Sequence, residues 1–519
     1  MNGDLGAAVG HFREEVDVTV TGLTLAVLAI FVAFRAAFPE QVSQVVLPRV
    51  REEMLSLFGP VFAVLMVLFV LFAIAIIAGP WGKIRLGGED ATPTYSYPAY
   101  FAMFFSAGIA AGIVFWAAGE PLFLYGFDTA DGGMAPFVGA EPGTPAATEG
   151  AMQATFFHWG ISAWSAYVAI AIPIAYYAYN RGAPLRLSTL LMPFIGKENV
   201  THPAAKLVDV LGVFATIGGI AVSVGLVGPQ FLSGVEFHWT TETSTIDTVI
   251  VIAGITLIFT VSVITGVKRG IRRIAGINVV LFALVALLTL VLGPTQYIFT
   301  NGAGAFVDYV LNFVQMNVAA IAPGSESAWF NTWTLFYWVW WFSWAPFAGL
   351  FLASISRGRT LRTVAGTGVF VAGLATLLWF AIVGNAVLHT QVEGVFDLLA
   401  IEGFALQEVA GFATFASFPM GELLVFGLFA LIITWLVTSA DTSTLIIAIL
   451  GTKPGIAPRT ASRAFWGVLQ GGMGLGLIVI GGADALQTAA VVTGGPIGVI
   501  ALVGIGGLAW EFYRRQEEE

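Results

Sequence analysis

Residues 333–347 carry more aromatic side chains than a membrane-length segment usually needs. The stretch reads WTLFYWVWWFSWAPF. The rings that share about 100° of one helical face are Trp333, Tyr337, Trp340, Trp341 and Trp344. Such a wall attracts a methylated ammonium group, because that cation cannot hydrogen-bond and sheds its water cheaply. The pattern indicates a binding surface for a quaternary ammonium group, with an aromatic belt at the membrane–water interface as the alternative.

The composition places the chain in a membrane. Of 519 residues, 57% are apolar and only 10% are charged, and the mean hydropathy is +0.86. These values exclude a soluble globule. The absence of cysteine excludes disulfides, thiolate metal sites and iron–sulfur clusters, and the net charge of −10 argues against a nucleic-acid partner. The segment before the first apolar run lacks a basic region, and that run is long enough to stay in the bilayer, so no cleaved signal peptide is expected.

Apolar runs of about 20 residues predict an all-α polytopic membrane protein with about 12 transmembrane helices. The runs lie near 19–38, 55–80, 98–126, 152–179, 205–235, 246–267, 275–299, 330–353, 363–389, 421–450, 460–482 and 487–511. Basic residues follow every second run, and only Arg13, Arg35, Arg49 and Arg51 of the 22 lie elsewhere. The positive-inside rule makes that side cytoplasmic, so we expect a plasma-membrane protein with both termini in the cytoplasm.

Three segments inside these runs are unusual. Run 3 carries small residues at 106–112 and Gly-Glu-Pro at 119–121, and run 8 carries Pro346 and Gly349. Helix interruptions in corresponding halves mark midplane binding sites in transporters, although simple packing by small residues explains run 3 equally well. Run 10 carries TSADTST at 438–444, and so many polar groups predict a pathway, an ion site or a cap at a helix break.

The segment FYWVWWFSWAPFAGLFLASISRGRTLR at 336–362 resembles the hallmark segment of the betaine/choline/carnitine transporters. The resemblance extends to HWGISAWSAY at 158–167, SAGIAAG and GEPL within 106–122, and VTSADTST at 437–444, in order over runs 3 to 12. It implies a LeuT-like fold with two inverted five-helix repeats and two extra N-terminal helices, alternating access at a central site, and a homotrimer.

On this basis the chain divides into six parts. They are a cytoplasmic N-tail (1–18), two N-terminal transmembrane helices (19–97), the first inverted repeat with runs 3–7 (98–300), an external amphipathic helix (301–329), the second inverted repeat with runs 8–12 (330–512) and a short cytoplasmic C-tail (513–519). The 127–150 loop is also expected outside the cell.

The resemblance also assigns a substrate box. The residues expected to line it are Trp159, Trp164 and Tyr167 of run 4, Trp340, Trp341 and Trp344 of run 8, and Gly108 and Ala110 of run 3. Of these, Trp159, Trp164, Tyr167 and Trp341 would cage the trimethylammonium group, at about 2 kcal/mol or more per desolvated contact. His158 is expected to be a hydrogen-bonded core residue rather than a ligand.

Two sodium sites are implied in the same way. The first uses backbone carbonyls around Ser106 and Ile109 with the hydroxyls of Thr438 and Ser439. Thr216 and Phe347 match the second site, but there Ile220 replaces a threonine. Sodium is thus the expected coupling ion, with no other cofactor.

The expected function is secondary active import of a small quaternary-ammonium osmolyte, glycine betaine or choline, by sodium symport. A sodium-independent exchanger of the carnitine type is the first alternative, but such proteins place a fixed positive charge where sodium binds, and no Lys or Arg occurs between Lys206 and Lys268. A membrane enzyme is the second alternative. It would need a cluster of catalytic side chains, whereas the five histidines are scattered along the chain.

Overall fold

The computed structural model describes residues 12–108, 110–126, 135, 138–265, 270–322 and 327–518. In these ranges the regular structure is helical, and extended chain forms only two isolated bridges. The helices are α2 (Val18–Ala37), α3 (Pro39–Gln41), α4 (Leu47–Ala78), α5 (Tyr97–Gly108), α6 (Ala110–Gly126), α7 (Pro145–Trp159), α8 (Ile161–Arg181), α9 (Met192–Ile195), α10 (Lys206–Trp239), α11 (Thr245–Thr265), α12 (Ile271–Leu292), α13 (Thr295–Ile321), α14 (Ser327–Phe330), α15 (Phe336–Ile355), α16 (Leu361–Gly366), α17 (Gly373–Val392), α18 (Leu406–Ala416), α19 (Gly421–Leu450) and α20 (Thr460–Glu518). Short π-helical segments at Val42–Val46, Asn331–Leu335 and Thr367–Ala372 join neighbouring helices.

The helices confirm an all-α polytopic membrane protein. Within the described residues, 11 helices are long and apolar enough to cross a membrane, or up to 12 if the bent pair α5–α6 counts as one span. Two boundaries differ from the sequence prediction. α13 begins at Thr295, so the expected external helix and its N-terminal flank form one long helix. α20 continues from Thr460 to Glu518 where two runs were expected, since residues 483–486 are helix-forming and contain no proline.

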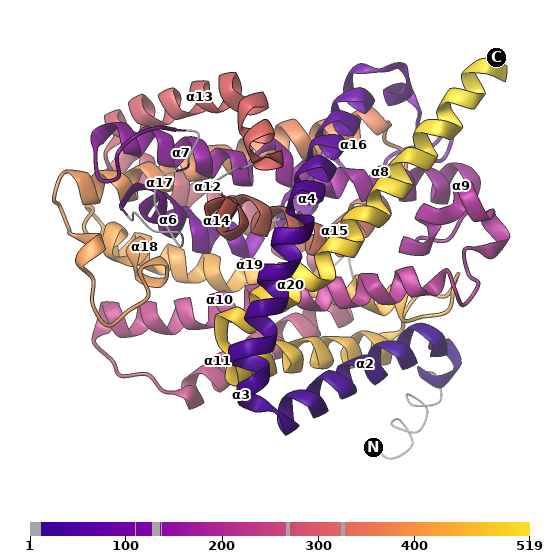
Figure 1. The fold of residues 1–519 in the computed structure, drawn as a ribbon, viewed down its shortest axis with the longest axis horizontal. Coiled ribbons are helices and arrows are strands. Elements are labelled where there is room, and N and C mark those ends of the chain that lie inside the picture. The colour runs from indigo at the N-terminus through magenta and orange to yellow at the C-terminus, as the bar shows by residue number, and fades with distance from the viewer. Residues whose placement is uncertain are drawn as a thin grey trace.

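Burial separates inner helices from outer ones. In the most apolar window of Ala328–Ile355, which contains α15, 94% of the residues are buried, against 22% in α2. α15 lies near the centre of the view in Figure 1 and packs against α8, α10 and α20. The outer helices α2, α11, α12 and α13 leave rows of apolar side chains exposed. The most aromatic helix of the chain is therefore surrounded by protein.

Two spans are interrupted beside α15. α5 and α6 meet at an angle of 58° around residue 109, which lies outside the described residues. α7 ends and α8 begins at Gly160, where a Cβ would lie 2.8 Å from the Tyr309 hydroxyl. The predicted interruption at Pro346 is wrong, because α15 runs through that residue unbroken. Gly349 serves close packing instead, since a Cβ there would lie 2.6 Å from Ile170.

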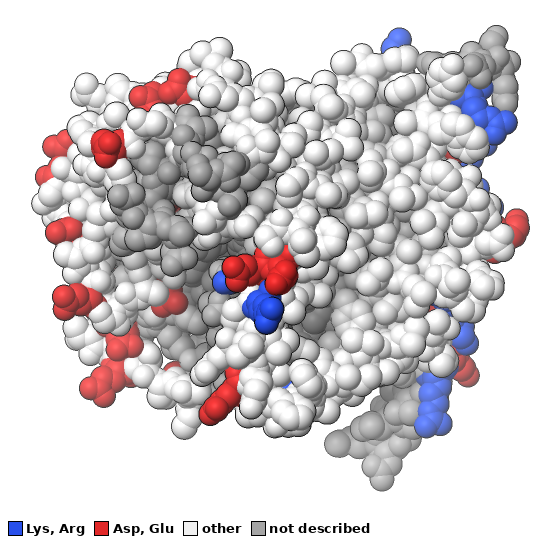
Figure 2. All heavy atoms as spheres, in the orientation of Figure 1, with Lys and Arg blue, Asp and Glu red and all other residues white. Residues whose placement is uncertain are grey.

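Four of the loops that carry basic residues lie together. Arg85 and Thr360 form an isolated bridge, and Asn180 donates to the Arg85 carbonyl at 2.9 Å. Arg186 reaches the Thr452 carbonyl at 2.9 Å. The ends of runs 2, 4, 8 and 10 thus lie together, as the charge pattern predicts. Figure 2 shows acidic side chains mainly toward the left of the view and basic ones mainly toward the right, with one cluster of both signs near the centre of an otherwise largely uncharged surface.

Which end faces the cytoplasm stays a prediction. Positions 357 and 141 are exposed and lie in loops expected inside and outside respectively, and the chain has no cysteine. In intact cells, an impermeant thiol reagent should label Glu141→Cys and should label Arg357→Cys only after lysis. Labelling of Arg357→Cys from outside would reverse the orientation.

Candidate functional site

The aromatic residues of α15 form one buried stack. Trp340 and Trp341 stack with ring centroids 5.0 Å apart, and Tyr337 stacks on Trp341 at 5.6 Å. Trp344 meets Trp340 edge to face at 6.1 Å. The three indoles are fully buried, which contradicts an aromatic belt at the interface. The rings face other helices rather than the membrane–water interface.

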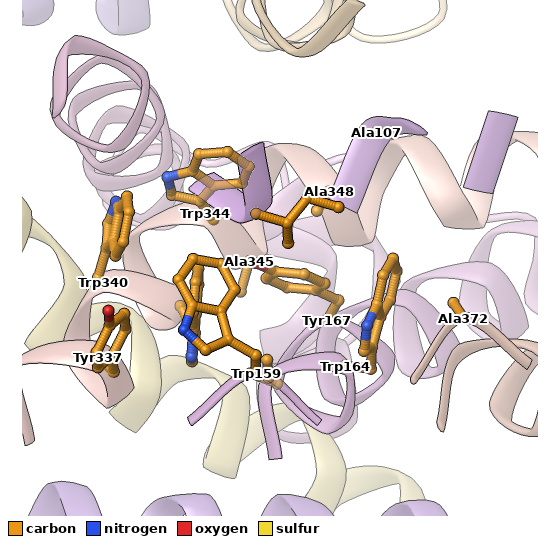
Figure 3. Packing of buried hydrophobic residues seen from close by; sticks show 14 of the residues in the cluster. Ala107, Trp159, Trp164, Tyr167, Tyr337, Trp340, Trp344, Ala345, Ala348 and Ala372 are labelled. Atoms are coloured by element: carbon orange, nitrogen blue, oxygen red, sulfur yellow. The ribbon is translucent and has the colours of Figure 1, made fainter. Parts of the chain in front are cut away.

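Trp159 of α7 packs against this stack. Its ring contacts Trp341 edge to face at 4.9 Å, and the Trp341 indole N–H donates to the His158 carbonyl at 3.0 Å. Phe380 of α17 lies 4.9 Å from Trp159 on another side. In Figure 3, Tyr337 and Trp340 lie on one side of Trp159. Rings from three helices therefore pack together around Trp159.

Trp164 and Tyr167 lie on the other side of Trp159 in Figure 3. Their rings meet edge to face at 5.8 Å, and the Trp164 N–H donates to Thr376 of α17 at 3.1 Å. Trp164 also stacks on Phe105 of α5 at 5.9 Å. The structure thus gathers the six predicted rings in one region, with Trp164 against α5 and Trp159 against α15.

Glycines at the α5–α6 break let these rings approach the backbone. A Cβ at Gly108 would lie 2.4 Å from the Trp164 ring, and one at Gly112 would lie 2.9 Å from the Trp159 ring. Any larger residue would displace an indole. Residue 109 and the side chain of Ala110 lie outside the described part of the structure.

A buried carboxylate organises one side of the rings. Glu120 of α6 is fully buried and accepts from the Trp159 indole N–H at 2.5 Å and from the Tyr337 hydroxyl at 2.6 Å. Its other oxygen lies 2.6 Å from His158 Nδ1, and His158 Nε2 lies 3.0 Å from the Thr334 hydroxyl. An ionised carboxylate only accepts, so Nδ1 carries the proton of that bond. His158 is a hydrogen-bonded core residue, as predicted.

Two donors beside the box have no partner. The Trp340 indole N–H and the Tyr167 hydroxyl are buried and make no hydrogen bond within the protein. The Trp344 N–H, by contrast, donates to the Gly219 carbonyl at 3.0 Å, while the Trp333 and Trp338 N–H groups of the same segment are unpartnered as well. An unmet buried donor costs about 1–3 kcal/mol unless a ligand or water fills the place.

The predicted first sodium site converges on α12. The Ser106 hydroxyl is 3.5 Å from the Ala275 carbonyl, and one turn further along α12, Asn278 donates to the Thr438 hydroxyl at 2.6 Å. Ser439 is fully buried, and its hydroxyl has no partner. An orphaned buried oxygen beside a positioned hydroxyl fits a cation ligand. Ile109 lies outside the described residues.

At the second predicted sodium site, the hydroxyl groups already have hydrogen-bond partners. Thr216 donates to the Gly212 carbonyl at 2.7 Å, and Ser223 donates to the Gly219 carbonyl at 3.4 Å. Phe347 is buried against Trp344 with centroids 5.3 Å apart. Ile220, between the two hydroxyls, is fully buried and supplies no oxygen. Neither hydroxyl is orphaned, in contrast to that of Ser439.

Sequence reasoning missed Glu120, Asn278, Thr376 and Phe380. A signal existed for the first two, because a carboxylate or amide inside an apolar run must find partners within the protein. Glu120 stood in the noted Gly-Glu-Pro segment but was treated only as part of a helix interruption. Thr376 and Phe380 had no signal, since their contacts depend on how α17 packs.

We expect Gly108→Ala to displace the Trp164 ring and to destabilise the box by about 1–3 kcal/mol, as overpacking does. Gly254→Ala on α11 is a matched control, because a Cβ there meets no atom within 4 Å. Thermal unfolding and ligand binding of the purified variants test this. Equal stability and binding in the two variants would show that the close ring contact is unimportant.

The sequence is similar to known transporters over nearly its whole length. The model of the betaine/carnitine/choline family transporters matches residues 19–517. The glycine betaine transporter OpuD of Bacillus subtilis is 34% identical over 463 residues, which cover 89% of this chain and 88% of the relative. A probable glycine betaine transporter of Desulfitobacterium hafniense is 33% identical over 489 residues, covering 93% and 95%.

Substrate names vary among the relatives. A glycine betaine/proline/choline/ectoine transporter of Vibrio parahaemolyticus is 32% identical over 441 residues, covering 84% of this chain and 76% of the relative. Among solved structures, a substrate-bound, outward-open sodium-coupled sialic acid symporter superposes with a TM-score of 0.47 at 13% identity, covering 86% and 87%. The family match and the sequence relatives lead to one conclusion: the chain belongs to the betaine/carnitine/choline transporter family and is a membrane transporter rather than an enzyme.

Proposed function

We propose that this protein imports a small quaternary-ammonium osmolyte, glycine betaine before choline, by sodium symport with alternating access. The enclosed group of indole and phenol rings beside the buried Glu120 is the observation that carries the proposal. The name of the Bacillus subtilis relative supports the substrate class.

The cationic end of the substrate is assigned to the rings. Trp159, Trp341 and Trp340 offer π-faces and edges within one region, and cation–π contacts gain strength where water is excluded. The Glu120 carboxylate, held by the same rings, adds a negative charge beside them. A ligand without a positively charged group would gain nothing from that negative charge.

The anionic end is assigned to the unpartnered donors. The Trp340 N–H and the Tyr167 hydroxyl lie on opposite sides of Trp159 in Figure 3, so a substrate carboxylate would meet one of them, and a bond to a charged acceptor is worth about 1.5–3 kcal/mol. Choline has a hydroxyl in place of the carboxylate and would form weaker bonds there. This difference favours glycine betaine.

Sodium is assigned to the oxygens around Thr438 and Ser439, and the incomplete second site makes one sodium ion per substrate the expected stoichiometry.

Residence in the plasma membrane with cytoplasmic termini, and a homotrimeric state, belong to the same proposal. The exposed apolar residues Val307, Leu311, Val314 and Val318 of α13 suit contact with lipid or with a neighbouring subunit.

Uptake into proteoliposomes tests the proposal directly. Radiolabelled glycine betaine, choline, carnitine, proline and ectoine should be compared with a sodium gradient and with sodium replaced by potassium. We expect glycine betaine to accumulate only with the sodium gradient. Equal uptake in potassium would reject symport, and exchange against internal substrate without sodium would favour the carnitine-type exchanger.

We expect Trp341→Leu to weaken substrate binding about 100-fold, since it removes the ring beneath the cation. Trp341→Phe should retain more of the affinity, because a smaller ring remains while the bond to the His158 carbonyl is lost. Equilibrium binding of radiolabelled substrate measures both. Trp510→Leu is the matched control, since Trp510 is 49% exposed on α20, away from the box. A Trp341→Leu variant that binds like wild type would rule out the box assignment.

We expect a near-hyperbolic sodium dependence of uptake and its loss in Thr438→Ala with Ser439→Ala, because sodium needs about five or six oxygen donors. Ile220→Thr should steepen the dependence by restoring an oxygen. Thr444→Ala is the control, as its hydroxyl is bonded to the Ala440 carbonyl of its own helix at 2.6 Å. A wild-type Hill coefficient approaching two would mean that Ser223 completes the second site.

A further inference from the structure

Asp441 of α19 is a buried charge that the proposed transport site does not use. Its side chain is fully buried, and its Oδ2 accepts a hydrogen bond from Ser262 of α11. Its Oδ1 has no hydrogen-bond partner within the protein. A carboxylate with so few donors is costly in an apolar interior, so the position calls for a functional explanation.

The neighbouring arginine, Arg463, forms no close ion pair with Asp441. No lysine, arginine or histidine nitrogen in the described part of the chain lies within 4.0 Å of the Asp441 oxygens. Arg463 of α20 attracts Asp441 from further away, and it also attracts Glu15 and donates to the Val263 carbonyl at 3.3 Å. Asp441 thus has no close cationic partner among the described residues, and a bound cation would supply one.

The proposed sodium site lies close to this carboxyl group. Asp441 follows Thr438 by three positions on the continuous helix α19, which places the two side chains about 5–6 Å apart at Cβ on adjoining parts of the helix surface. The donors assigned to sodium are hydroxyls and backbone carbonyls, all neutral. A cation among neutral donors in low-dielectric surroundings is strongly favoured by a negative charge within about 7 Å.

We propose that Asp441 is the counter-charge of the coupling cation, a positioning residue that sets sodium affinity through its field without touching the ion. The inference rests on the proposed sodium symport. The other explanation is structural: the Ser262–Asp441 hydrogen bond simply ties α11 to α19.

Two variants separate charge from hydrogen bond. Asp441→Asn keeps the shape and an acceptor for Ser262 but removes the charge, whereas Ser262→Ala removes the hydrogen bond and keeps the charge. The charge explanation predicts that the half-saturating sodium concentration rises at least about tenfold in Asp441→Asn and changes less than about threefold in Ser262→Ala. Glycine betaine affinity at saturating sodium should stay close to wild type in both.

A third variant keeps the test decisive if Asp441→Asn fails to fold. Arg463→Gln removes the opposing positive charge, so the half-saturating sodium concentration should fall about threefold. Sodium-dependent uptake in proteoliposomes measures all three variants. Unchanged sodium dependence in Asp441→Asn, an equal loss in Ser262→Ala, or weaker sodium binding in Arg463→Gln would each overturn the counter-charge. Sodium-independent uptake by wild type would instead overturn the proposed symport, so the two failures can be told apart.

Discussion

The burial of the Glu120 carboxylate is the constraint on which the rest of the site depends. A charge enclosed in a helical bundle must be met by donors within the protein, because no water or headgroup reaches it. The donors here are the indole N–H of Trp159, the hydroxyl of Tyr337 and His158, from α7 and α15. Each bond that stabilises the carboxylate also orients a ring. The negative charge and the aromatic walls are therefore built by the same contacts, and both favour a cation.

The interrupted helices α5 and α6 bring their backbone close to the aromatic rings. α5 and α6 bend at small residues, and Gly108 and Gly112 admit Trp164 and Trp159 to distances that a Cβ would forbid. On the opposite side, Ser106 and Thr438 meet at successive turns of α12. One broken span thus contacts both the aromatic rings and α12, the helix that holds the Thr438 hydroxyl. A rearrangement of α5 and α6 would change both sites together, which is the physical requirement for coupling them.

Much of this could be predicted from the sequence, because it depends on composition and helical period. The apolar runs predicted the helices, and the aromatic face of 333–347 predicted a wall of rings that binds a ligand rather than a belt at the interface. Local patterns could not show that α15 passes through Pro346 unbroken, since that depends on the helices packed around it, among them α8 with Ile170 close against Gly349. Likewise α20 has no loop where an apolar run weakens, because helix propensity persists there. Glu120 and Asn278 were visible as polar residues in apolar runs, but their partners come from other helices. Only the fold shows those contacts.

A comparison of ligands with their uncharged carbon isosteres tests the central claim most directly. Glycine betaine and 3,3-dimethylbutanoate have the same shape and the same carboxylate and differ only in the positive charge, as do choline and 3,3-dimethylbutan-1-ol. Equilibrium binding to the purified protein in saturating sodium isolates the value of that charge. If aromatic walls and a buried carboxylate select a cation, glycine betaine should bind at least about 100-fold more tightly than its isostere. Equal affinities would mean that the site selects shape alone, and would contradict the account.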